Sequence, residues 1–361
     1  MVLTKIEAFP RERERERGRL RHGYDDIISI ENLLISWQEF LCGKRKKKDV
    51  EAFSADLMDN ILQLRQELVE RTYKHGGYEA FVISDPKTRS IHKALVRDRL
   101  LHHAIHRILY PYFDKKFIYD SYSCRVNKGT HRAIDHLRDF GRKVSQNDTK
   151  TAWVLKCDVR KFFASIQHGV LKNILKRYIE DGDVLWLLDE VIDSFHIEND
   201  TAVGLPLGNL TSQLLINVYM NEFDQFVKHV LKVKYYIRYA DDFVILNADK
   251  NCLENLLPKI NVFLNEKLKL TPHPNKVSIK TLASGIDFLG WIQFPDHRVL
   301  RTTTKRRMLR RWGQNSTEET YNSYLGLIRH GNTQKLRERL TKDYVLLAKK
   351  VKRKPLTSCD S

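Results

Sequence analysis

Residues 239–242 read Tyr-Ala-Asp-Asp and place two adjacent carboxylates between two apolar runs. The flanking residues 235–238 and 243–246 are mostly aromatic or β-branched, and this composition predicts two strands joined by a tight turn. Two neighbouring carboxylates repel each other, so Asp241 and Asp242 favour a divalent cation as their partner. A plain hairpin turn without a cation would also account for these two residues.

A third carboxylate, Asp158, ends the apolar run of residues 153–158 and is followed by basic and then aromatic residues. The run predicts a strand that lies beside the hairpin, although an aspartate at a strand end can also cap a turn or helix. Three such carboxylates can hold two Mg²⁺ ions and support phosphoryl transfer. Because side chains alternate along a strand, we expect Asp242 to face partly away.

Residues 204–213 (Gly-Leu-Pro-Leu-Gly-Asn-Leu-Thr-Ser-Gln) form a glycine-rich loop that leads into an apolar run with helical spacing. The sequence therefore predicts a loop that opens a core-facing helix. Gly208 has no Cβ and would let a base pair or sugar approach the backbone closely. A helix-entry turn without a ligand is the alternative.

The chain resembles reverse transcriptases in three palm motifs, which lie in this order at Asp158, residues 208–213 and residues 239–242. The resemblance runs from about residue 30 to residue 340. It implies an α+β fold, the right-hand polymerase, with fingers, a palm of antiparallel sheet plus helices, and a helical thumb. The expected parts are a charged arm (1–28), fingers and the first part of the palm (29–150), palm (151–295), thumb (296–345) and basic tail (346–361).

The motif variant is most similar to reverse transcriptases of diversity-generating retroelements, on the residues Leu207, Gly208, Ser212 and Gln213. That likeness implies an RNA-directed DNA polymerase that copies a template RNA into cDNA with frequent errors, because an aliphatic Leu207 cannot hydrogen-bond near the new base pair. Implied partners are template RNA, a DNA or cDNA primer, deoxynucleoside triphosphates and a small basic accessory protein. A phage-defence or group II-like reverse transcriptase, or a catalytically inactive RNA-binding relative, stays open.

The resemblance also implies roles for single residues. Arg89 suits the incoming triphosphate because its planar fork holds phosphate oxygens bidentately. Phe163 would exclude a ribose 2′-hydroxyl, and Lys276 would protonate the leaving pyrophosphate; a core phenylalanine and a surface lysine are the alternatives. The implied residues are as follows: catalytic Asp158, Asp241, Asp242 and Lys276; ligands of two Mg²⁺ ions Asp158, Val159, Asp241 and Asp242; nucleotide-binding Lys87, Arg89, Phe163, Leu207, Gly208 and Gln213; primer grip Phe288, Leu289 and Gly290.

Two arginines and three histidines follow Arg89 in the chain. Arg97 and Arg99 could form ion pairs within the protein as readily as they could bind phosphate. His102, His103 and His106 fall within one apolar helical pattern, so packing or RNA contact is favoured over zinc.

Composition agrees with a nucleic-acid partner. Lys and Arg number 63 against 45 Asp and Glu, which gives a net charge of +18 and favours a polyanion. The five cysteines include no Cys-x-x-Cys pair, and no apolar run reaches membrane-spanning length. We therefore expect a cytoplasmic protein without a membrane partner.

Local patterns predict several other elements. Apolar residues recur at helical spacing from Phe53 to Leu68 and predict a helix that ends near residues 75–77. Residues 81–83 predict a short strand, and residues 305–340 predict basic helices. The alternating Arg-Glu run of residues 11–17 has no apolar face and predicts a solvated arm.

Overall fold

The structure is a computed structural model that describes residues 18–21, 23–84, 88–197 and 201–352. The chain forms two compact units that alternate along the sequence. The first unit comprises residues 1–127, 157–243 and 255–277, and the second comprises residues 128–156, 244–254 and 278–361.

The first unit begins with a group of helices in which α2 and α3 pack against α6. Their bounds are α2 Tyr24–Ile28, α3 Ile30–Phe40, α4 Lys48–Ala55, α5 Leu57–Val69 and α6 Val96–Asp114. The last part of the predicted arm, residues 24–28, forms α2, and Tyr24, Ile27 and Ile28 are buried in this group. The Arg-Glu run lies outside the described residues.

The helix predicted from Phe53 onward is divided into α4 and α5. Asp56 has φ −115° and ψ 42°, which interrupts the helical backbone between them. The expected end near residues 75–77 is wrong, because α5 ends at Val69 and the following Arg71 takes a left-handed conformation with φ 56°. The predicted buried face is confirmed: Ile61, Leu64 and Leu68 are fully buried.

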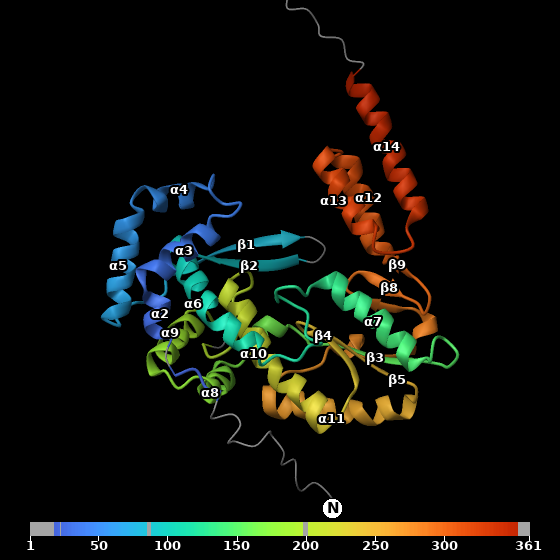
Figure 1. The fold of residues 1–361 in the computed structure, drawn as a ribbon, viewed down its shortest axis with the longest axis horizontal. Helices are drawn as coiled ribbons and strands as arrows, with labels where there is room; N and C mark the ends of the chain where they lie inside the picture. The colour runs from blue at the N-terminus through green and yellow to red at the C-terminus, as the bar shows by residue number, and fades with distance from the viewer. Residues whose placement is uncertain (1–17, 22, 85–87, 198–200, 353–361) are drawn as a thin grey trace, which may run out of the picture. The chain divides into compact units, whose positions relative to one another are not determined.

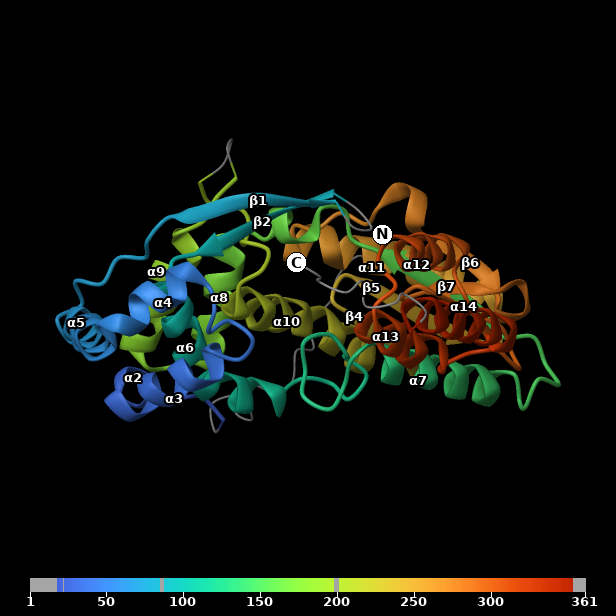
Figure 2. The ribbon, with the colours of Figure 1, turned by 90° about the horizontal axis from the view of Figure 1, so that it is seen from above.

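An antiparallel hairpin follows the helices, with β1 Tyr78–Ser84 and β2 Thr88–Ala94 (Figures 1 and 2). Its register runs from Tyr78 opposite Ala94 to Ser84 opposite Thr88. The strand predicted at residues 81–83 is confirmed as part of the longer β1. Nearly all residues of β1 and the first three of β2 are exposed, so this end of the hairpin presents its side chains to solvent.

The rest of the first unit surrounds a long buried helix, α10, which contacts α6 and α8. The helix predicted after the glycine-rich loop is therefore confirmed. The remaining elements are η1 Phe162–Ser165, α8 His168–Tyr178, α9 Gly182–Asp193, α10 Leu210–Gln225, the π-helical turn η2 Phe226–Val230 and η3 Pro274–Lys276. Buried side chains cover nearly the whole circumference of α10, which places it inside the core.

A four-stranded sheet has the strand order β4–β5–β3–β6. Its strands are β3 Trp153–Asp158, β4 Tyr235–Tyr239, β5 Asp242–Asn247 and β6 Ser278–Thr281. The predicted strand before Asp158 and the predicted hairpin are both confirmed, and β5 is the strand next to β3. This order brings the end of one acidic strand beside the hairpin turn. The long helix α11, Lys250–Leu268, follows β5 in the chain.

The second unit contains a small sheet and a group of C-terminal helices. Its elements are α7 Thr130–Val144, η4 Leu282–Ser284, β7 Ile286–Phe288, β8 Trp291–Gln293, β9 Arg298–Leu300, α12 Thr302–Gln314, α13 Glu318–Ile328 and α14 Gln334–Lys352. The predicted helices of residues 305–340 are confirmed. The expected tail is wrong at its start, because α14 continues past residue 345 through a stretch rich in Lys, Leu and Ala, which favour helix.

The mixture of helices and sheets confirms the predicted α+β class. Within the part of the chain that the structure describes, no helix combines the length and apolar character needed to cross a lipid bilayer.

An aromatic cluster around Phe223 anchors α10 in the core of the first unit. Phe223 is fully buried, and its ring centroid lies 4.9 Å from that of Phe243 and 6.1 Å from those of Tyr236 and Phe263. We predict that Phe223→Ala lowers the free energy of unfolding by about 3–5 kcal/mol, because it leaves a cavity. Urea unfolding followed by circular dichroism measures this. The exposed Met58→Ala should change it by less than about 0.5 kcal/mol; equal losses in both variants would contradict the prediction.

Candidate active site

Asp158 and Asp241 lie next to each other at the ends of neighbouring strands. The backbone N–H of Val159 donates a hydrogen bond to the carbonyl of Asp241 at 3.3 Å, which ties the end of β3 to the hairpin turn. Burial raises the pKa of Asp241 above its ordinary value, and the negative charge of Asp158 raises it further. The charges of the two carboxylates therefore interact directly.

The hairpin turn consists of Ala240 and Asp241. Ala240 has a φ of 55°, in the left-handed region, and Asp242 is the half-buried first residue of β5. Among the described residues, no three Asp, Glu, His or Cys side chains are grouped so that they could hold a metal ion. The structure places Asp158 beside Asp241, and Asp242 follows as the next residue of the chain.

Lys276 supplies a positive charge at the carboxylate pair. Its Nζ lies 2.7 Å from Oδ1 of Asp158, which has 17% of its side chain exposed. The segment before it is held along β3, because the N–H of His273 donates to the carbonyl of Asp158 at 2.7 Å. Lys276 is therefore not an isolated surface lysine, and its charge lowers the pKa of Asp241 against the effects of burial and Asp158.

Arg89 is a second cation whose charge reaches this pair. It lies on β2, its residue is exposed, and its charge also lowers the pKa of Asp241. Arg97 and Arg99 instead form ion pairs within the protein, at 2.7 Å to Glu67 and 2.6 Å to Asp49. Lys87, the other expected nucleotide-binding cation, lies outside the described residues.

The glycine-rich loop is bonded to β2. The N–H of His92 donates to the carbonyl of Leu207 at 3.1 Å, and Nδ2 of Asn209 donates to the carbonyl of His92 at 3.1 Å. Gly208 has a φ of 112°, and a Cβ there would lie 2.9 Å from a methyl carbon of Ile91. Glycine is needed here for its backbone conformation and for the close approach of β2.

Phe163 and Gln213 are both half-buried. The carbonyl of Phe163 accepts a hydrogen bond from the N–H of Leu205 at 2.9 Å, and the neighbouring Phe162 is the buried one of the two rings. Phe163 is therefore placed beside the glycine-rich loop without being a fully buried core residue.

The histidines of α6 pack against other rings. His102 is buried and its ring centroid lies 5.2 Å from that of His75, while His103 contacts Phe40 and His106 stacks on Tyr110. Burial holds the pKa of His102 well below its ordinary value, so this imidazole stays neutral.

Phe288, Leu289 and Gly290 lie in the second unit, at the turn between β7 and β8. Leu289 has φ 50° and Gly290 has φ 86°, and two consecutive positive values are typical of a tight hairpin turn. Phe288 is buried with 1% exposure. Leu289 and Gly290, in the turn itself, are half-buried.

Sequence reasoning missed three residues that support this site. Arg238, Asp224 and Asn209 are buried polar residues, and each forms hydrogen bonds to segments that carry site residues. A signal for Arg238 was present, because a charged residue inside an apolar strand needs a buried partner. The identity of that partner follows only from the fold.

A comparison with protein families finds that the model described as "Reverse transcriptase (RNA-dependent DNA polymerase)" matches residues 83–293. This segment contains the carboxylate pair, Lys276, Arg89 and the glycine-rich loop.

Curated relatives are similar over about two thirds of the chain. "Protein YkfC" of Escherichia coli is 27% identical over 67% of this chain and 71% of its own length. "Group II intron-encoded protein LtrA" of Lactococcus lactis is 22% identical over 69% of this chain and 51% of its own length. Among solved structures, telomerase from Candida albicans is 11% identical with a TM-score of 0.48, over 64% of this chain and 48% of the other. The chain thus spans about half the length of LtrA.

The electrostatic coupling of the pair can be tested directly. We predict that Asp158→Asn lowers the pKa of Asp241, because it removes the repelling charge, whereas Lys276→Met raises it, because it removes an attracting one. Carboxyl ¹³C titration by NMR of aspartate-labelled protein, without added metal, measures both shifts. Asp296→Asn, at an exposed residue, is the control. An Asp241 pKa that is the same in all four proteins would contradict the coupling.

Proposed function

Because the chain belongs to the reverse transcriptase (RNA-dependent DNA polymerase) family, we propose that it copies an RNA template into cDNA from deoxynucleoside triphosphates. The family has the right-hand polymerase fold, to which the mixture of helices and sheets conforms. The observation that carries the proposal is the coupled pair of Asp158 and Asp241, with the charges of Lys276 and Arg89 beside it. The net charge of +18 suits the polyanionic template and primer.

Two Mg²⁺ ions fit the donors of this site. The carboxylates of Asp158, Asp241 and Asp242 and the backbone carbonyl of Val159 are hard oxygen ligands of the kind that Mg²⁺ prefers. Burial and then repulsion by Asp158 raise the pKa of Asp241, and Asp158 already binds the ammonium of Lys276, so the pair attracts cations. When bound, Mg²⁺ would polarise the primer 3′-hydroxyl and neutralise charge on the triphosphate.

The other side chains bind and orient the nucleotide. Arg89 would hold phosphate oxygens through its planar fork, and Lys276 would give the proton on Nζ to the leaving pyrophosphate. Phe163 would exclude a 2′-hydroxyl by shape, since the flat ring leaves no space for it. Leu207, Gly208 and Gln213 would contact the new base pair and its sugar, and the turn at Leu289 and Gly290 would hold the primer.

The subclass that we propose is the diversity-generating retroelement type, with a structured template RNA and a small basic accessory protein as partners. The support is the aliphatic Leu207 followed by Gly208, Ser212 and Gln213. A group II-like reverse transcriptase is the second candidate, and the likeness to LtrA, a group II intron-encoded protein, favours it. The error pattern of the cDNA separates the two.

The proposed activity is tested by primer extension on an RNA template with Mg²⁺ and deoxynucleoside triphosphates. We predict that Asp241→Asn lowers kcat by about a hundredfold or more, because an amide cannot supply the lost charge. Asp296→Asn, an exposed aspartate with 79% of its side chain accessible, should extend the primer at the wild-type rate.

Full extension by Asp241→Asn would contradict the role of that carboxylate. If the folded wild-type protein binds RNA but extends no primer, the proposal fails in favour of an inactive RNA-binding relative.

We predict that Leu207 determines the error rate of cDNA synthesis. We expect Leu207→Gln to lower errors opposite template adenines by about tenfold, because a glutamine amide can hydrogen-bond near the nascent pair. Sequencing of the cDNA gives the error rate at each template base. Leu207→Ile keeps an aliphatic side chain and should keep the wild-type pattern; an error rate that is unchanged in Leu207→Gln would contradict the subclass.

A further inference from the structure

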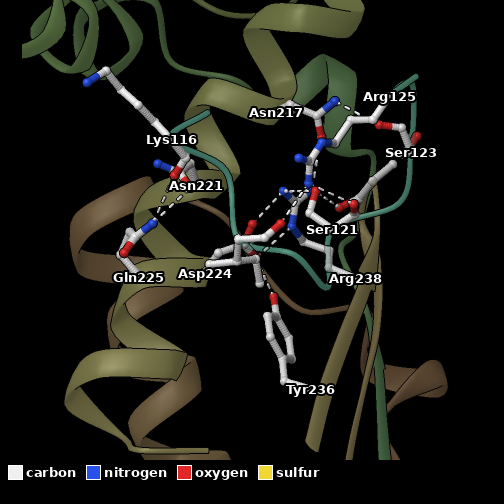
Figure 3. A network of polar contacts seen from close by, with 12 residues as sticks. Lys116, Ser121, Ser123, Arg125, Asn217, Asn221, Asp224, Gln225, Tyr236 and Arg238 are labelled. Atoms are coloured by element: carbon white, nitrogen blue, oxygen red, sulfur yellow. Dashed lines mark hydrogen bonds and ion pairs between the residues drawn. The ribbon is translucent and has the colours of Figure 1, made fainter. Parts of the chain in front are cut away.

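Arg238 is a fully buried cation on β4, three residues before Asp241, and every donor of its guanidinium has an acceptor (Figure 3). A guanidinium has five N–H donors. They are used as follows: Nε to Asp224 Oδ1 at 2.8 Å, Nη2 to Asp224 Oδ2 at 2.6 Å, Nη2 to Ser121 Oγ at 3.2 Å, Nη1 to Asn217 Oδ1 at 3.3 Å and Nη1 to the carbonyl of Ala240 at 3.1 Å.

The partner carboxylate is held as firmly as the guanidinium. Asp224 lies near the end of α10, is fully buried, and accepts a further hydrogen bond from Tyr236 Oη at 2.7 Å. A buried ion pair is weak evidence for stability, because desolvation of both charges offsets their attraction. The bidentate geometry instead fixes the position and orientation of the guanidinium.

One of the five bonds reaches the catalytic turn itself. The carbonyl of Ala240 accepts from Nη1, and Ala240 has the left-handed conformation that residues with a Cβ adopt only at an energetic cost. Such a conformation persists where its surroundings hold it. On the other side of Asp241, its own carbonyl accepts from the N–H of Val159. Hydrogen bonds therefore hold both the carbonyl that precedes Asp241 and the carbonyl of Asp241 itself.

The guanidinium also joins this turn to the helix that follows the glycine-rich loop. Asn217, its partner on α10, donates to the carbonyl of Gln213 at 3.2 Å and to that of Ser123 at 3.0 Å. The backbone of Arg238 pairs with residues 120–122, through its N–H to the carbonyl of Asp120 at 3.0 Å and its carbonyl to the N–H of Tyr122 at 2.9 Å. Three segments of the first unit therefore meet at this side chain: the hairpin, the loop at Ser121 and α10.

We propose that Arg238 is a positioning residue for the catalytic carboxylate: its guanidinium, oriented by Asp224, holds the left-handed turn at Ala240 and so sets where Asp241 lies relative to Asp158. The inference rests on the proposed polymerase function. Arg238 acts through the backbone and not through its charge, which Asp224 neutralises. Lysine cannot replace it, because an ammonium has three donors and no planar fork.

The test compares Arg238→Lys with Tyr236→Phe. Arg238→Lys keeps the charge and loses the fork, so it releases Ala240. Tyr236→Phe removes a hydrogen bond from the same buried carboxylate but leaves all five guanidinium bonds, so it is the matched control for stability. In primer extension, we expect Arg238→Lys to lower kcat by about 10–100-fold with the KM for nucleotide unchanged. Tyr236→Phe should lower the melting temperature and leave kcat at the wild-type value.

Hydrogen exchange supplies a readout that does not depend on activity. In the absence of metal and substrate, the peptide that contains Val159 should exchange faster in Arg238→Lys than in the wild type, because the turn that accepts its N–H is no longer held. Tyr236→Phe should leave that peptide protected. Asp224→Glu keeps the ion pair but displaces the guanidinium by the length of a methylene, and it should show the same changes in smaller degree. If Arg238→Lys does not fold, the exchange and kcat of Asp224→Glu test the proposal instead.

Wild-type protection of this peptide in the folded variants, or equal loss of kcat in Tyr236→Phe and Arg238→Lys, would overturn the proposal. If the wild-type protein extends no primer, the polymerase function fails, whereas the exchange data still show whether Arg238 holds the turn.

Discussion

The repulsion between the carboxylates of Asp158 and Asp241 is the constraint to which the other features of the first unit respond. Two negative charges at the ends of adjacent strands disfavour each other, and partial burial strengthens the effect. An apolar core contact is favourable by itself, whereas these two carboxylates lie together only because the surrounding structure holds them there. Neighbouring strands of the sheet supply the backbone geometry, and the charges of Lys276 and Arg89 reduce the electrostatic cost.

The support comes from different levels of the structure. The hydrogen bond from Val159 joins the two strand ends, and the ion pair of Lys276 with Asp158 places a positive charge beside the two carboxylates. Arg238 and Asp224 work from the buried side of the hairpin, where no substrate can reach. The two repelling carboxylates are thus supported from below by a buried guanidinium whose donors all have hydrogen-bond acceptors.

Much of this arrangement was predictable, because local patterns determine local elements. The aromatic and β-branched residues around Asp241 and the apolar run before Asp158 predicted strands that the structure contains, and the glycine-rich loop predicted the start of α10. Boundaries were less predictable. The break at Asp56 and the end of α5 depend on backbone conformations that no periodic pattern encodes.

Contacts between distant segments were the least predictable part of the site. The partner of Lys276, the hydrogen bonds of Asn209 and the acceptors of Arg238 involve residues far apart in sequence, and single-sequence patterns carry no information about such pairs.

The bonds of His92 to Leu207 and Asn209 have a mechanical consequence. They attach the exposed hairpin that carries Arg89 to the loop from which α10 begins. Any swing of this hairpin must either break both bonds or move the loop with it, and a side chain in place of Gly208 would meet Ile91. Under the proposed function, contact of Arg89 with the triphosphate and contact of this loop with the base would therefore depend on each other.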